Sequence, residues 1–217
     1  MNFFKKIFQS KKEATLNDST PELEEDHIEL YVNNVLSIPD RIVNEFIYQH
    51  GLNEKIIYNF LTYKHDSDFG GTGWNEKGKL NFPGPFYTGV TDTCGTGIVE
   101  APNNIIFDEN CREFVMIQPR TKIELVQLWN AGAAEVFGSY YCDGNENWTV
   151  QLVKEWWANK NEVLEHLKNS ELIKMNQNQE KRYLHYLENE AKLDLRKYCY
   201  FLENGLYPND ESLPELD

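Results

Sequence analysis

The sequence predicts an α+β fold, with helices at both ends around a small antiparallel β unit that has long Gly/Pro-rich loops. Three observations predict this class. Apolar residues recur at helical spacing before residue 64 and after residue 121. Two β-prone runs, residues 105–107 and 113–117, flank an Asp-Glu-Asn turn and indicate a hairpin. Residues 65–104, before the hairpin, are dense in glycine and proline, which favour turns.

Local signals set the ends of the expected N-terminal helices. Thr20 and Pro21 are typical of a helix start, and a second helix is expected after Ser37. The side chain of Asn53 is suited to cap a third helix. These patterns predict that the first third of the chain is helical.

The stretch NFPGPFYTGVTDTCGTGIVEAPNN, residues 81–104, has no amphipathic period. Short strands are expected at residues 79–82 and 98–100, on either side of the turns. Ordering so many turn residues costs conformational entropy, so packing or function has to offset that cost. The expectation is that its glycines serve turns and that its rings are partly buried.

The later helices carry clearer signals. Thr121 and Glu124 form a Thr-x-x-Glu capping box, and Gly132 is expected to end that helix. Thr149 begins another helix, with a break near residues 159–161. Apolar residues then recur through residues 177–204, which predicts one long helix.

The expected domain organisation has two parts. Residues 1–19 form a short amphipathic N-terminal segment and a polar linker, and residues 20–217 form a single α+β domain. The N-terminal segment has no secretory cleavage pattern. We expect it to dock its aromatic rings on the body of the protein or to fray, and weak binding to a bilayer is the alternative. Within the domain, the expected parts are a helical 20–64, a loop and hairpin at 65–120, a helical 121–205 and an acidic tail at 206–217.

The net charge of −14, from 35 acidic and 21 basic residues, argues against nucleic-acid binding. It favours solubility, and it speeds association with a basic protein partner. The apolar runs are too short for a transmembrane helix, so no stable membrane insertion is expected. With no export signal, a cytoplasmic location with reduced cysteines is expected.

Sites for cofactors and metals find little support. The repeated Gly-Thr-Gly at residues 71–73 and 95–97 resembles a phosphate loop, but Ile98 and Pro102 stand where a P-loop needs Lys-Ser/Thr and a helix. The four cysteines lack the close spacing of zinc or iron–sulfur ligands. We therefore expect no cofactor and no metal.

Cys94 is the candidate nucleophile of an enzymatic alternative. It lies in a polar loop, and Asp92 and His65 are the candidates for orienting group and base. Asp92 is equally suited to form an Asx-turn with its own backbone. This alternative places an active site without a known motif in the loops 65–104 and 138–148.

A binding surface is the other candidate, because rings in loops can anchor a partner and acids can steer it. The alternative for each ring is that it fills the core beneath the loop. A groove for a small ligand or peptide, lined by Trp74, Phe86 and Trp148, is a further alternative. The candidate surface consists of Trp74, Phe86, Tyr87, Asp92, Glu100, Tyr140, Tyr141 and Asp143.

The runs FPGPFYTG, TDTCGTG and EAPNN, followed by WTVQLVKEWW, resemble a group of small bacterial proteins of unassigned function over about residues 80–160. Some members carry a ferredoxin label, which the cysteine spacing here does not fit. In size, charge and lack of catalytic motifs the chain also resembles bacterial toxin-immunity proteins. That resemblance implies an inhibitor that neutralises a toxin by occluding its active surface.

Overall fold

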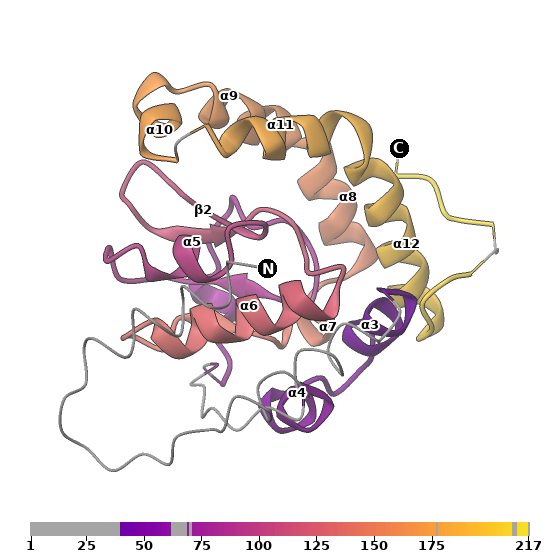
Figure 1. The fold of residues 1–217 in the computed structure, drawn as a ribbon. Helices are drawn as coiled ribbons and strands as arrows, with labels where there is room; N and C mark the ends of the chain where they lie inside the picture. The colour runs from indigo at the N-terminus through magenta and orange to yellow at the C-terminus, as the bar shows by residue number, and fades with distance from the viewer. Residues whose placement is uncertain (1–39, 62–68, 70, 177, 210–211, 217) are drawn as a thin grey trace, which may run out of the picture. The chain divides into compact units, whose positions relative to one another are not determined.

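The computed structural model describes residues 40–61, 69, 71–176, 178–209 and 212–216. These residues form an α+β fold with helices and two antiparallel sheets of two strands each (Figure 1). They belong to one compact unit, Val35–Asp217. The helix expected after Thr20, the predicted domain boundary at residue 20 and the N-terminal segment all lie outside the described residues.

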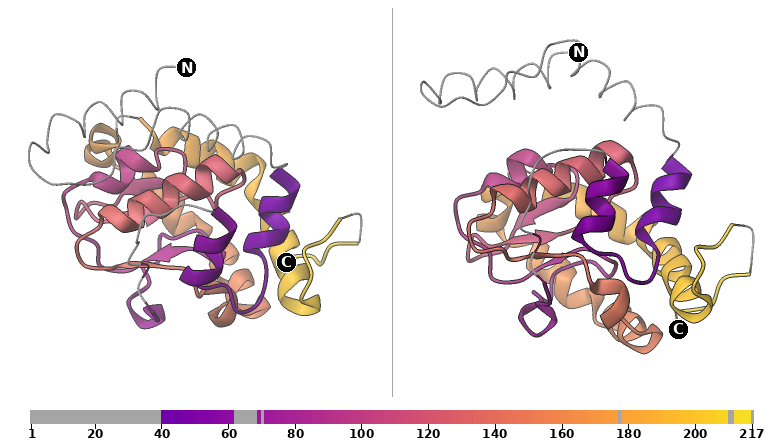
Figure 2. Two further views of the ribbon diagram at one scale, coloured as in Figure 1. Left: turned by 60° about the horizontal axis from the view of Figure 1, so that its bottom comes forward. Right: turned by 90° about the horizontal axis from the view of Figure 1, so that it is seen from below.

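Two short helices open the described part of the chain, α3 (Asp40–Ile47) and α4 (Glu54–Leu61). The Asn53 side chain accepts a hydrogen bond from the Ile56 amide at 3.1 Å, so the expected cap is confirmed. The rings of Phe46 and Phe60 stack between the two helices with centroids 3.7 Å apart. Two further views show α4 beside α6 (Lys122–Ala134) and α3 beside α12 (Ala191–Asn204) (Figure 2).

The predicted hairpin is confirmed by β2 (Ile105–Phe107) and β3 (Glu113–Val115), which pair in antiparallel register. A second pair joins β1 (Tyr87–Thr88) to β4 (Tyr140–Tyr141). The sequence did not predict this second sheet, because each strand has two residues and its partner lies far along the chain. It brings the Gly/Pro-rich stretch against the segment that follows α6.

The prediction of short strands at residues 79–82 and 98–100 is wrong. Residues 79–82 form turns and bends, although the Phe82 amide donates to the Val115 carbonyl at 2.8 Å. Residues 98–100 belong to a short helix, α5 (Thr96–Glu100), which begins after Gly95 in the left-handed region at φ 75°. Pro102 lies just beyond the end of this helix, where proline is tolerated.

Helix α6 confirms one predicted end and corrects the other. Its capping residue Thr121 accepts a hydrogen bond from the Glu124 amide, as the capping box predicts. Gly132 does not end the helix, which continues to Ala134. A side chain at Gly132 would meet the ring of Phe69 at 2.7 Å, so this glycine allows close packing.

The remaining helices stand in the C-terminal part of the chain. The break predicted near residue 159 is confirmed, since Asn159 separates α8 from α9. The single long helix predicted over residues 177–204 is wrong, because the chain turns at Glu190 between α11 and α12. The helices are α7 (Gly144–Asn147), α8 (Val150–Ala158), α9 (Lys160–Leu167), α10 (Ser170–Met175), α11 (Glu180–Asn189) and α12 (Ala191–Asn204).

Aromatic rings dominate the core. The β2–β3 hairpin lies between α6 and the helices α9 and α11 (Figure 1), and Phe114 of β3 contacts Tyr183 of α11. On the other side, the ring of Phe69 stacks on Trp129 of α6 at 5.3 Å. Among the largest fully buried side chains are Trp129, Tyr87, Tyr140, Tyr183, Tyr198, Phe82, Phe86 and Phe201.

Candidate functional site

The β1–β4 pair brings together most of the candidate binding residues, but it buries many of them. Tyr87 and Tyr141 are partners in the register, and their rings stack with centroids 5.1 Å apart. The buried rings therefore follow the alternative in which they fill the core beneath the loop. The buried candidates are Phe86, Tyr87, Asp92, Tyr140 and Tyr141.

Trp74, Glu100 and Asp143 are partly exposed. The Asp143 side chain accepts hydrogen bonds from the Tyr87 hydroxyl at 2.6 Å and from the side-chain amide of Asn147 at 3.0 Å. Burial, reinforced by Asp143, raises the pKa of Tyr87, so its hydroxyl stays protonated and donates. Glu100 lies at the end of α5, apart from these groups.

The ligand groove expected along Trp74, Phe86 and Trp148 is filled by the protein's own side chains. Trp74 and Trp148 pack edge to face at 5.1 Å, and the Lys77 amine lies over both rings, at 5.1 and 4.7 Å. Burial lowers the pKa of Lys77 to about 8. Phe86, with 1% exposure, lies in the core.

Glu113 of β3 fixes the start of α5 from inside the protein. Its side chain, in a residue with 1% exposure, accepts hydrogen bonds from the Gly97 amide at 2.7 Å and the Tyr140 hydroxyl at 2.7 Å. Burial raises the pKa of Glu113, while these hydrogen bonds oppose the rise. Any side chain at position 97 would meet the Tyr140 oxygen at 2.1 Å, so the approach requires glycine.

Two further buried carboxylates, Glu135 and Asp92, interlock the segments 89–94 and 135–139. Glu135 accepts hydrogen bonds from the amides of Asp92, Phe137 and Ser139, at 2.9, 3.1 and 2.7 Å. Asp92 accepts from the amides of Cys94 and Val136, at 2.7 and 3.3 Å. Each turn is thus held by the side chain of the other, which fixes the backbone of both.

The two interlocked turns expose apolar side chains. Val90 is 45% exposed, Val136 76% and Phe137 67%. We call these three residues the apolar tip. Residues 89–92 and 135–139 lie side by side, since the Ser139 hydroxyl donates to the Val90 carbonyl at 2.7 Å. The tip is therefore an apolar surface on a fixed backbone, a combination typical of contact sites.

The two stretches of sequence that contain the apolar tip carry only negative formal charge. Residues 80–111 and 123–153, which supply the tip and its support, contain no lysine, arginine or histidine. The acids in these stretches are Asp92, Glu100, Asp108, Glu109, Glu124, Glu135, Asp143 and Glu146. The acidic composition of these stretches therefore suits a partner with a basic surface.

The structure does not support a nucleophilic Cys94. The thiol is exposed, and Asp92 is the first of the groups that raise its pKa, which disfavours the reactive thiolate. The Cys94 amide donates to the Asp92 side chain, which is the Asx-turn alternative. His65, the proposed base, lies outside the described residues.

The described residues contain no group of three or more His, Cys, Asp or Glu side chains arranged to hold a metal ion. None of the described helices has the length and apolar character that a membrane crossing requires. Comparison with known proteins gave no match to a family model, to a curated protein or to a solved structure. The resemblances read from the sequence motifs stay predictions.

The apolar tip was not predicted from the sequence. Its signal is the run Glu-Val-Phe-Gly-Ser at residues 135–139, where two adjacent apolar residues precede a turn glycine. Gly138 has a φ of 64°, a value that favours glycine. Apolar residues next to such a turn cannot all face a core, and this marks them as candidates for a surface.

Proposed function

We propose that this chain is a protein-binding protein that docks the apolar tip against a partner with a basic surface. In the finer form of the proposal, the partner is a toxin, and the chain acts in the cytoplasm as an immunity protein that occludes the toxin's active surface. The observation that carries the proposal is the exposure of Val136 and Phe137 on a turn fixed by buried Glu135.

Rigidity makes this surface suitable for tight binding. A flexible loop loses conformational entropy when it binds. The turn 135–139 loses little, because two of its own amides bond to Glu135, which also binds the Asp92 amide of the neighbouring turn. Phe137 provides an aromatic anchor with few rotamers to freeze, and Val90 and Val136 extend its apolar contact. The tip therefore supplies affinity.

Charge supports the choice of a basic partner. The net charge of −14, with no lysine or arginine in residues 80–111 and 123–153, gives the protein an acidic field. Such a field accelerates association with a cationic surface, and salt screens it. The association rate with the partner should therefore fall as ionic strength rises.

The test uses the protein encoded by the gene next to this one as the candidate toxin. The neighbouring product is expressed in a bacterial host with and without this chain, and growth is measured. We expect growth to stop with the neighbour alone and to recover when the wild-type chain is present. A neighbour that does not affect growth would overturn the immunity proposal.

A double variant then locates the contact. Val136→Ser with Phe137→Ser should weaken binding by about 10- to 100-fold, measured by calorimetry, because it removes the anchor. Leu206→Ser is the matched control, since Leu206 is 71% exposed and follows the C-terminal end of α12. Equal affinity of the double variant and the control would contradict docking through the tip.

A further inference from the structure

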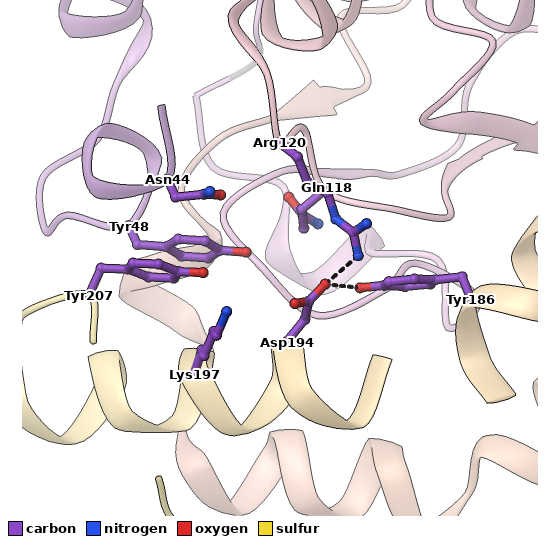
Figure 3. Close-up of a pocket in the computed structure, with 8 residues that line it drawn as sticks. All are labelled: Asn44, Tyr48, Gln118, Arg120, Tyr186, Asp194, Lys197 and Tyr207. Carbon is purple, nitrogen blue, oxygen red and sulfur yellow. Dashed lines mark hydrogen bonds and ion pairs between the residues drawn. The ribbon is translucent and has the colours of Figure 1, made fainter. Parts of the chain in front are cut away.

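A pocket of about 280 Å³ opens between α3, α11, α12 and the segment that precedes α6 (Figure 3). The volume is near the lower end of the range for small-ligand sites. Beside the amides of Asn44 and Gln118, its lining has two cationic side chains, one carboxylate and three tyrosines. They are Tyr48, Arg120, Tyr186, Asp194, Lys197 and Tyr207.

Arg120 forms a fixed wall of this pocket. Its guanidinium contacts Glu190 at 2.7 Å and Asp194 at 2.6 Å, and it lies 4.9 Å from the centre of the Tyr186 ring. Burial alone would lower the pKa of Arg120, but the negative charges of Asp194 and Glu190 outweigh burial, so the pKa is raised. Asp194 also accepts a hydrogen bond from the Tyr186 hydroxyl at 2.9 Å.

Lys197 supplies a second cation from α12. Its amine points into the pocket (Figure 3) and has no ion-pair or hydrogen-bond partner among the described residues. The side chain is only partly exposed. The amine is thus a donor with unused capacity.

Two tyrosine hydroxyls complete the set of donors. The rings of Tyr48 and Tyr207 stack at 4.9 Å, and both hydroxyls point toward the pocket (Figure 3). Neither hydroxyl has a hydrogen-bond partner in the part of the chain that the structure describes. Burial raises the pKa of Tyr48, and it raises that of Tyr207 to about 12, so both hydroxyls remain protonated.

We infer that this pocket binds a small organic anion whose carboxylate or phosphate oxygens accept hydrogen bonds from Lys197, Tyr48 and Tyr207. The three donors face one space, whereas Oδ2 of Asp194 already accepts from Arg120 and Tyr186. Donors without acceptors favour a ligand that supplies oxygen lone pairs. This inference is independent of docking at the apolar tip.

The charges of the pocket agree with an anionic ligand. Arg120 and Lys197 balance Asp194 and Glu190, so the pocket is close to neutral in a chain with a net charge of −14. An anion would meet the unpaired Lys197 amine rather than an excess of carboxylates. The aromatic faces of Tyr48 and Tyr207 add an apolar wall against which a ring or chain can pack.

The probes are inorganic phosphate, phenyl phosphate and benzoate, titrated into the full-length protein, with sodium chloride at matched ionic strength. The measurement is the change in backbone amide chemical shifts by NMR. We expect saturable shifts at Lys197 and Tyr207 with a phosphate or a carboxylate probe, and the tighter class identifies the head group. Shifts that do not saturate with any probe, or that chloride reproduces, would overturn the inference.

Substitutions test the named donors. Lys197→Gln should weaken binding of the tighter probe by about tenfold, and Tyr207→Phe by about threefold, because each removes one donor to an anion. Lys192→Gln makes the same charge change on α12 outside the pocket and should leave the affinity unchanged. Equal losses for Lys192→Gln and Lys197→Gln would contradict a site at Lys197.

Discussion

The central region, residues 71–148, and the C-terminal helices α8 to α12 are ordered by different means. In the C-terminal helices, apolar faces meet: Leu195 and Phe201 of α12 are fully buried. In the central region, buried polar side chains bind backbone groups of distant segments. Asn81, with no exposure, bonds to the amides of Thr88 and Val115 and to the carbonyl of Thr88, at 2.9 to 3.0 Å.

The central region shows how a stretch rich in glycine and proline can be ordered without a large sheet. Gln118 bonds to the carbonyls of Phe82 and Phe86, and Asn176 bonds to both backbone groups of Phe107. These amides replace the missing strand partners, because buried backbone groups need hydrogen bonds. The rigid tip at Val136 is a product of this construction.

The largest loss of stability is expected where Gly144 packs against the backbone of residues 84–85. A side chain at Gly144 would meet the Gly84 carbonyl oxygen at 2.1 Å and the Pro85 carbonyl oxygen at 2.8 Å. Gly144→Ala should lower the free energy of unfolding by about 3 kcal/mol, because a backbone neighbour cannot rotate away. Urea denaturation followed by circular dichroism measures the loss.

Gly71→Ala is the matched control, since the structure places no atom within 4 Å of the added methyl group. We expect its free energy of unfolding to stay within about 0.5 kcal/mol of the wild type. Equal stabilities of the two variants would show that α7 and residues 84–85 are not tightly packed.

A second pair of substitutions compares a buried polar residue of the central region with a buried apolar residue of α12. Asn81→Leu introduces an apolar side chain of similar size and leaves the amides of Thr88 and Val115 without acceptors, so a loss of about 2 to 3 kcal/mol is expected. Leu195→Met in α12 should cost less than about 1.5 kcal/mol. Thermal and urea denaturation measure both losses. A larger loss of stability for Leu195→Met than for Asn81→Leu would contradict the different ordering of the two regions.

A smaller effect is expected from pH through Lys77. Burial lowers the pKa of Lys77 from 10.5 to about 8, so above pH 8 the folded protein releases a proton that the unfolded chain retains. The unfolded state then binds more protons, and stability rises with pH. Between pH 8 and 9.5 the contribution is about 1 to 2 kcal/mol.

Lys77→Met should lack the rise in stability between pH 8 and 9.5 that comes from Lys77. The other ionisable groups are the same in both proteins, so their effects cancel in the comparison. The comparison requires urea denaturation of both proteins at pH 8 and at pH 9.5. The same change of stability with pH in both proteins would mean that Lys77 is not desolvated over Trp74 and Trp148.

Helix ends that depend on neighbouring residues could be predicted from the sequence. Asn53, Thr121 and Thr149 cap their helices as expected, and Gly205, with a φ of 72°, follows the last helix. These signals act between residues a few positions apart.

The central region was harder to predict because its partners lie far apart. Strand β1 pairs with β4 across more than 50 residues, and Glu113 receives its donors from Gly97 and Tyr140. An acid at such a position looks like any surface acid in the sequence. The apolar tip and the pocket around Lys197 likewise depend on tertiary contacts.

The rigidity of the apolar tip is the claim on which the proposed function most depends, and amide hydrogen exchange measures it directly. The amides of Asp92, Phe137 and Ser139 donate to Glu135. All three should exchange slowly in the free protein, as amides in fixed structure do. Exchange at the rate of an unstructured turn would contradict a preformed contact surface.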